Sequence, residues 1–165
     1  MDVARVLKHL ALPGWSLRRA FGSDDLAAIG AAVAASERAH RGELRFVVEG
    51  PLPLASLWHG ESARQRAAGL FARYRVWDTE ENSGILIYVQ LADRRVEILA
   101  DRGIAAKVPQ AEWDAICREM EQAFRAGRWR EGALAAVARA GELLAANFPA
   151  GERNPNELPD QPLVL

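Results

Sequence analysis

The sequence contains very little cysteine and no excess of charge of either sign. Cys117 is the single cysteine among the 165 residues, so an intramolecular disulfide and a Cys-x-x-Cys metal pair are both excluded. Lysine and arginine total 21 and aspartate and glutamate total 22, which gives a formal net charge of -1. This balance gives no global electrostatic reason to expect nucleic-acid binding, although a local charged patch is compatible with it.

Long apolar runs are also absent. Residues 26–36 are uncharged, but this stretch is far shorter than the roughly 20 apolar residues that cross a bilayer. Near the N-terminus, Arg5, Lys8 and His9 interrupt what would be the apolar part of a signal peptide. Because 50% of the residues are hydrophobic and 26% are charged, the composition is that of an ordinary globular domain. We therefore expect a soluble, cytoplasmic protein, with peripheral attachment to the inner membrane left open.

Familiar catalytic and nucleotide-binding motifs are missing from the chain. It has no Gly-x-Ser-x-Gly elbow, no P-loop, no His-Glu-x-x-His zinc motif and no Gly-x-Gly-x-x-Gly fingerprint. No nucleotide cofactor is therefore expected. Cys117 lies between Ile116 and Arg118 in an amphipathic helical pattern, which favours a packing thiol over a catalytic nucleophile.

The spacing of apolar residues predicts an alternation of helices and strands. The predicted helices begin near residues 23, 61, 109 and 131 and end near residues 42, 74, 127 and 147. Runs of β-forming residues predict strands at 44–48, 84–89 and 95–100. A helical crossover joins the first two strands, so they should be parallel, and the third should return antiparallel to the second. The predicted fold class is α/β: a three-layer sandwich in which a small mixed β-sheet carries helices on both faces.

Three parts are expected along the chain: an N-terminal helical segment at 1–22, an α/β domain at 23–149 and a proline-rich C-terminal arm at 150–165. In the first part, apolar residues recur at helical spacing at Val3, Val6, Leu7 and Leu10. This pattern fits either a short helix packed on the edge of the core or a helix that docks on a membrane surface or a partner. The arm is predicted to be extended, either on the surface or disordered.

The predicted topology brings polar residues from distant parts of the sequence to one end of the sheet. The first two strands start at the same end if they are parallel, and the third strand finishes there. The residues beside these strand ends are Glu37, His40, Glu43, Asp78, Glu81, Asn82, Asp101 and Arg102. Crowded carboxylates repel one another unless they are protonated or neutralised by a cation. Calcium takes six to eight oxygen ligands, which such a rim supplies.

We therefore predict an acidic cleft that holds Ca²⁺ or Mg²⁺. The predicted metal ligands are Asp78, Glu81, Asn82 and Asp101, and the residues predicted to line the cleft around them are Glu37, His40, Glu43 and Arg102. The loop does not match an EF-hand, and a solvated acidic turn that keeps the hairpin soluble is the alternative interpretation.

The order of the motifs resembles a known family. An Asn82-Ser83-Gly84 sequence opens the second strand, Asp93-Arg94-Arg95 follows it, and Asp101-Arg102-Gly103 follows the third strand. A helix ending in Phe124-Arg125-Ala126-Gly127 comes next. This combination resembles the TPM domain, named for a thylakoid lumen protein, a photosystem II repair protein and a nematode receptor auxiliary protein. The resemblance covers residues 25–148.

The resemblance implies an α/β sandwich and an acidic cleft that binds calcium in some members. Carried over by motif, its candidate residues are Asp78, Asn82 and the neighbourhood of Asp101. Phosphatase activity has been ascribed to part of the family, whereas other members look like non-enzymatic binding or assembly factors. Many members have a signal peptide and a C-terminal transmembrane helix, and this chain is similar to the shorter soluble bacterial branch.

The expected function is a non-catalytic module that binds a divalent cation or a partner in membrane-protein maintenance. The expected partner is a membrane-bound TPM-type relative or another membrane-associated protein. Two alternatives stay open. One is a metal-assisted phosphatase, in which carboxylates hold the ion and Arg102 clamps the phosphate. The other is a plain interaction scaffold that docks through its N-terminal helix or its C-terminal arm.

Overall fold

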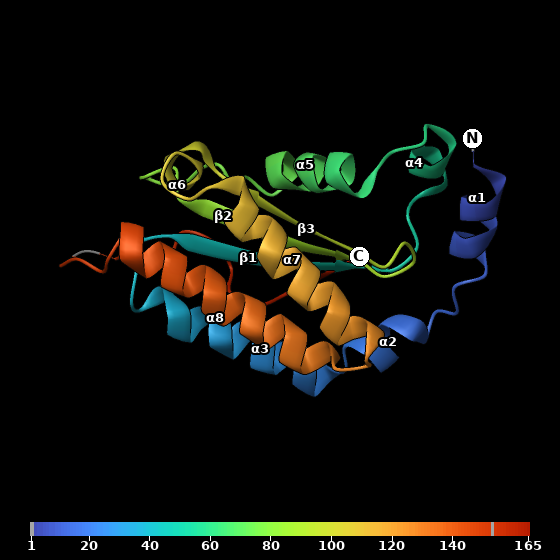
Figure 1. Cartoon of the computed structure of the whole chain (residues 1–165), viewed down its shortest axis with the longest axis horizontal. Coiled ribbons are helices and arrows are strands. Elements are labelled where there is room, and N and C mark those ends of the chain that lie inside the picture. The colour runs from blue at the N-terminus through green and yellow to red at the C-terminus, as the bar shows by residue number, and fades with distance from the viewer. Residues whose placement is uncertain (1, 153) are drawn as a thin grey trace.

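A four-stranded mixed sheet forms the centre of the molecule, with the strand order β3-β2-β1-β4 (Figure 1). The computed structural model describes residues 2–152 and 154–165. Strands β1 (Glu43–Glu49) and β2 (Gly84–Gln90) are parallel, and β3 (Arg95–Ala100) is antiparallel to β2. The predicted topology of these three strands is confirmed, with bounds that differ by at most one residue. The sequence does not predict β4 (Leu163–Val164), which pairs parallel with the outer edge of β1.

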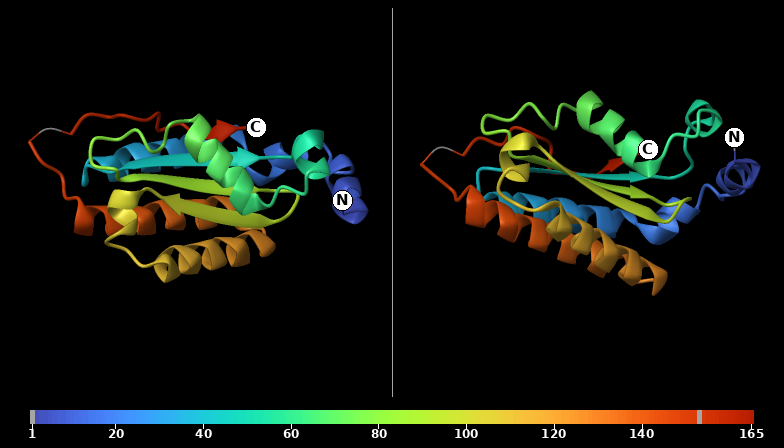
Figure 2. Two further views of the ribbon diagram at one scale, coloured as in Figure 1. Left: turned by 90° about the horizontal axis from the view of Figure 1, so that it is seen from above. Right: turned by 45° about the horizontal axis from the view of Figure 1, so that its top comes forward.

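Helices cover both faces of the sheet, so the predicted three-layer α/β sandwich is confirmed (Figure 2). Helices α3 (Ser23–Glu37), α7 (Gln110–Arg125) and α8 (Trp129–Asn147) cover one face. Helix α5 (Ala63–Arg73) covers the other. All seven residues of β2 are buried, which explains why its sequence is an apolar run without alternation.

The larger core lies between the sheet and its three covering helices. The apolar stripe of α7 is fully directed into it, and the buried residues of this stripe are Trp113, Ile116, Met120 and Phe124. Phe21 packs edge-on against the rings of Phe46 and Phe124, at centroid distances of 6.2 and 5.8 Å. Burying side chains of this size contributes about 1.5–3 kcal/mol each, so this side of the sheet supplies most of the apolar stabilisation.

Two segments extend beyond the sandwich. At the N-terminal end lie α1 (Val3–Leu10) and α2 (Ser16–Ala20), with α4 (Leu54–Trp58) beside α1. At the other end, the short α6 (Arg102–Ala105) joins β3 to α7. In the part of the chain that the structure describes, no helix combines the length and the hydropathy that crossing a bilayer requires.

The C-terminal arm crosses the sheet edge next to β1 and does not extend away from the domain. Leu158 is buried in the smaller core under α5. Arg45 of β1 donates from Nη1 to the carbonyl oxygens of Pro159 and Gln161, at 2.6 and 2.7 Å. Residues 158–161 of the arm thus lie over the polar face of β1, and residue 153 lies outside the described residues.

Candidate functional site

The residues of the predicted acidic cleft flank the strand ends where β1 and β2 begin and β3 finishes. We call this region the polar end. The 78–83 loop lies against the start of α6, because the amide nitrogens of Gly103 and Asp101 donate to the carbonyl oxygens of Asn82 and Gly84, both at 2.9 Å. A Cβ atom on Gly103 would overlap the carbonyl oxygens of Glu81 and Asn82. Glycine at this position therefore allows the loop and the helix to meet.

Arg102 contacts both Asn82 and Asp101. The Arg102 Nε donates to the Asn82 side-chain oxygen at 3.0 Å, and Asp101 Oδ1 caps α6 by accepting from the Arg102 amide at 2.7 Å. Asn82 has φ of 53°, a left-handed conformation that asparagine tolerates better than most residues. These three predicted residues are therefore brought together, with a guanidinium next to the predicted oxygen ligand.

Asp78 and Glu81 are paired with arginines of the chain. The Arg41 guanidinium donates to both carboxylate oxygens of Glu81, each at 3.0 Å, a bidentate geometry that fixes the carboxylate. Asp78 lies 3.5 Å from Arg75 in an exposed ion pair. Both negative charges have an internal counter-charge, so this part of the loop does not need a metal to relieve repulsion.

Glu37 and Glu43 are buried under the C-terminal arm. Glu37 accepts from the Leu44 amide at 2.9 Å, and Glu43 accepts from the Leu158 amide at 2.9 Å. Burial raises the pKa of Glu37 to about 9 and that of Glu43 to about 7, because desolvation disfavours the charged form. The nearby Asp160 raises both pKa values further. Burial therefore favours the protonated form of both carboxyls, and no cation is needed to neutralise them.

His40 is also fully engaged. Its Nδ1 lies 2.9 Å from the Gly42 carbonyl oxygen and its Nε2 lies 2.9 Å from the Ser36 hydroxyl. A carbonyl can only accept, so Nδ1 carries the proton and Nε2 accepts from the hydroxyl. Burial lowers the pKa of His40, which keeps the ring neutral. His40 therefore fastens the end of α3 and has no free nitrogen for a metal or a proton transfer.

The contacts described above do not arrange these residues around a position for a divalent cation. Among residues 2–152 and 154–165, no three His, Cys, Asp or Glu side chains converge as a metal-binding group. Asp101 Oδ2 is buried, with no hydrogen-bond partner in the described chain, whereas the Asn82 side-chain oxygen already accepts from Arg102. Arranged in this way, the side chains do not form a calcium cage. Binding of Ca²⁺ or Mg²⁺ by Asp78, Glu81, Asn82 and Asp101 stays a prediction.

Sequence reasoning missed the partners of these residues, namely Arg41 and the arm residues Leu158 and Asp160. One signal in the sequence points to the arm. In β1, Glu43, Arg45 and Glu49 alternate with apolar residues, so one face of a central strand is charged. Such a face needs hydrogen-bonding cover when it is buried.

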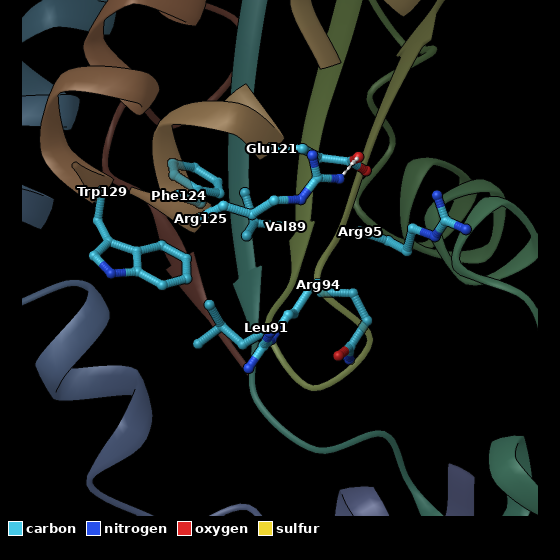
Figure 3. Close-up of a pocket in the computed structure, with 9 residues that line it drawn as sticks. Val89, Leu91, Arg94, Arg95, Glu121, Phe124, Arg125 and Trp129 are labelled. Carbon is cyan, nitrogen blue, oxygen red and sulfur yellow. Dashed lines mark hydrogen bonds and ion pairs between the residues drawn. The ribbon is translucent and has the colours of Figure 1, made fainter. Parts of the chain in front are cut away.

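At the opposite end of the sheet, a pocket of about 180 Å³ opens between the β2–β3 turn and the end of α7 (Figure 3). We call it the arginine pocket. Its apolar lining consists of Val89, Leu91, Phe124 and Trp129, and its charged lining consists of Arg94, Arg95, Arg125 and Glu121. The sequence analysis assigned none of these residues to a site.

Besides the polar end and the arginine pocket, the orientation of α1 is a candidate functional feature. Val3, Leu7 and Leu10 share one face of this helix and are 57, 60 and 63% exposed. The opposite face is attached to the domain by polar contacts: His9 Nδ1 accepts from the Leu52 amide at 2.9 Å, and Arg5 donates twice to Asp93. The predicted short helix is present and contacts the edge of the domain, and it does so through His9 and Arg5, whereas Val3, Leu7 and Leu10 face outward.

The chain was compared with known proteins. A family model described as the TPM domain matches residues 18–143. The NMR structure of the BA42 protein from the psychrophilic bacterium Bizionia argentinensis is 26% identical, with 88% of this chain and 95% of that chain covered and a TM-score of 0.77. The NMR structure of the N-terminal domain of a protein from P. gingivalis is 18% identical, covers 90% and 96% of the two chains with a TM-score of 0.61, and shows the fold alone. No curated protein matches.

Proposed function

The chain belongs to the TPM domain family, and from this premise we propose that it is a non-catalytic binding module of membrane-protein maintenance that attaches to the membrane surface through its N-terminal helices. The observation that carries this proposal is the outward apolar face of α1. Soluble domains normally bury such a stripe, and an exposed one marks an interaction surface. Helix α1 lies outside the residues that match the family model.

The neighbouring helix α4 extends the apolar surface. Leu54 and Trp58 are 64 and 69% exposed, and α4 contacts α1, as Figures 1 and 2 show at the N-terminal end of the molecule. Tryptophan is enriched at the membrane–water interface, where its ring matches the mixed polarity. We call Val3, Leu7, Leu10, Leu54 and Trp58 the apolar patch.

Charge near the patch favours an anionic lipid surface over a neutral one. Arg18 and Arg19 of α2 are exposed and have no carboxylate partner in the described part of the chain. Lys8, on the flank of α1, keeps nearly half of its side chain in solvent. Each basic residue near an anionic membrane surface contributes about 1 kcal/mol. A short amphipathic helix with basic flanks lies in the plane of the interface and binds reversibly.

The absence of catalysis in this proposal is supported by the state of the reactive groups. The only thiol, Cys117, is partly buried, and desolvation raises its pKa to about 12, so it stays protonated at neutral pH. His40 is neutral with both ring nitrogens engaged. Neither group has the lowered pKa of an activated nucleophile or the free lone pair of a general base.

The proposal is tested by flotation of the purified protein with vesicles that contain phosphatidylglycerol. We expect the wild type to float with these vesicles and to float less with pure phosphatidylcholine vesicles. The double variant Leu7→Glu with Leu10→Glu should stay at the bottom, whereas Trp77→Glu, an exposed apolar residue outside the patch, should float like the wild type. A wild type that ignores anionic vesicles overturns the proposal, and so does a double variant that floats unchanged.

A divalent cation at the polar end is a second candidate, favoured by one observation. Asp101 Oδ2 is buried and unpartnered in the described chain, and Asn82 Oδ1 accepts from the Arg102 guanidinium group. Movement of the Arg102 side chain would leave Asn82 Oδ1 as a second oxygen atom without a donor, and Ca²⁺ and Mg²⁺ prefer oxygen ligands. The phosphatase alternative depends on the same ion, so loss of p-nitrophenyl phosphate hydrolysis in Asp101→Asn at matched purity is its test.

A further inference from the structure

We propose that the arginine pocket binds an acidic peptide segment of a partner protein by enclosing one large apolar side chain and pairing Arg94 and Arg125 with the carboxylates beside it. In Figure 3 the rings of Phe124 and Trp129 lie on one side of the pocket, Arg94 lies at the turn beside Leu91, and Arg125 extends from α7 past Phe124 toward Glu121. Arg95 also lines the pocket, but its guanidinium group points away from it in Figure 3.

The apolar wall of the pocket is preformed. Phe124 and Trp129 are stacked with ring centroids 4.7 Å apart and planes at 25°. Phe21 packs edge-on against both rings at 5.8 Å, which holds them from behind. Val89 and Leu91 are buried and complete the floor. Because aromatic packing fixes this wall, a ligand side chain enters without reorganising the core.

The rim carries uncompensated positive charge. Arg94 is exposed and forms no hydrogen bond or ion pair from its side chain within residues 2–152 and 154–165. The Arg125 Nη2 lies 3.3 Å from Glu121 Oε2 in an ion pair, and Glu121 also accepts a hydrogen bond from the Val96 amide. One carboxylate therefore faces two guanidinium groups at the mouth. Guanidinium groups recognise carboxylates by paired hydrogen bonds, which gives geometric specificity.

The backbone conformation at Arg94 also supports a binding site at this turn. Its φ is 55°, in the left-handed region where glycine or asparagine is the usual residue of a tight turn. An arginine in this position is disfavoured by the local backbone, and strained positions of this kind cluster at binding sites. The turn that ends at Arg94 accordingly combines an unfavourable residue, a free cation and a preformed apolar wall.

Volume decides which class of ligand fits. Sites for cofactors and drug-sized molecules usually measure about 300–1,000 Å³, whereas this pocket measures about 180 Å³. That space suits a single aromatic or large aliphatic side chain. Peptide partners commonly anchor one such side chain in a pocket with charged contacts around it. An acidic peptide with one large apolar residue satisfies both the volume and the charge.

The pocket is joined to α1 through the same turn. Asp93, which precedes Arg94, accepts from Arg5 and lies 3.1 Å from His9 Nε2. A partner segment close to a membrane would therefore reach the pocket while α1 contacts lipid. The peptide experiment is performed without vesicles, so its failure is separate from any failure of membrane attachment.

Fluorescence polarisation with a labelled glutamate-rich peptide that carries one central phenylalanine tests the proposal. We expect Arg94→Gly to weaken binding about three- to fivefold, and Arg94→Gly with Arg125→Ala to weaken it about tenfold, because rim ion pairs of this kind are partly exposed. The control variant Arg118→Ala removes an exposed arginine of α7 that does not line the pocket, and it should bind as the wild type does. Glycine suits the turn, so these variants should keep the fold.

Three outcomes would overturn the proposal. The first is equal affinity of the wild type and the double variant. The second is equal affinity for a matched peptide with alanine in place of phenylalanine, because the apolar wall would then have no role. The third is displacement of the peptide by phenylacetate at the same concentration as the unlabelled peptide, which would identify a free small acid as the ligand.

Discussion

The two ends of the sheet treat charge in opposite ways. At the polar end, carboxylates from three segments flank the same strand ends, but Glu81 is paired with Arg41 and Glu43 accepts from the arm. At the opposite end, Arg94 is free in the described chain and stands beside an apolar pocket. The polar end has more charged residues in the sequence, yet more of its charged groups have partners within the chain. Density of ionisable residues is a weaker guide to a binding site than charge without an internal partner.

The largest test of this contrast is the pH dependence of stability at the polar end. Burial raises the pKa of Glu37 to about 9 and that of Glu43 to about 7, so the folded state binds more protons than the unfolded state above about pH 4.5. The unfolding free energy should therefore fall as the pH rises from 5 to 9, by about 3 kcal/mol from Glu43 alone. Glu43→Gln should flatten this fall in urea titrations between pH 5 and 9.

The matched control for that experiment is Glu80→Gln, because Glu80 is an exposed residue of the neighbouring loop. It should leave the pH profile unchanged. A wild type that becomes more stable between pH 5 and 9, with Glu43→Gln showing the same slope, would show that the buried carboxyls ionise without cost.

The second test removes the contact that holds the arm over β1. Arg45→Ala would leave the carbonyl oxygens of Pro159 and Gln161 without their charged donor. Hydrogen bonds to charged groups contribute about 1.5–3 kcal/mol, so we expect a loss of about 2 kcal/mol in urea unfolding. Faster amide hydrogen exchange should appear in β4. Arg38→Ala is the control, since Arg38 is exposed and forms no ion pair in the described chain. Unchanged exchange in β4 would contradict a holding role for Arg45.

The third test concerns the arginine pocket, and here the substitution is expected to raise stability rather than lower it. Arg94→Gly relieves the left-handed backbone at φ of 55°, where a side chain costs about 1 kcal/mol. The variant should therefore be about 1 kcal/mol more stable than the wild type, less the added flexibility of the unfolded chain. A gain in melting temperature together with weaker peptide binding would show stability given up for recognition. A loss of stability would mean that Arg94 has a structural partner.

The smallest expected effect is on cation binding at the polar end. Arg102→Ala removes the guanidinium from Asn82 Oδ1, beside the unpartnered Asp101 Oδ2. Calorimetric titration with Ca²⁺ should then give an affinity about three- to fivefold higher than that of the wild type, a gain of less than about 1 kcal/mol. The double variant Arg102→Ala with Asp101→Asn should lose the gain. Equal affinities in all three proteins would exclude this site for calcium.

The sheet and its layers could be predicted because buried strands and helix faces require recognisable patterns of apolar residues in the sequence. The apolar run of β2 and the stripe of α7 required no knowledge of distant residues. Helix α4 and strand β4 were missed, since both are short and depend on packing that is remote in sequence. The grouping of Asn82, Asp101 and Arg102 followed from topology, but their mutual hydrogen bonds did not.

The α/β layers, the parallel pairing of β1 with β2 and the membership of the TPM family follow from the amino-acid sequence, because periodicity and motif order are local properties. Three other features are visible only in the folded molecule: the internal partners of the acidic residues, the outward apolar face of α1 and the pocket beside Arg94. Ion pairing and the choice of which helix face is buried depend on contacts between distant segments. Such contacts exist only when the whole chain is folded.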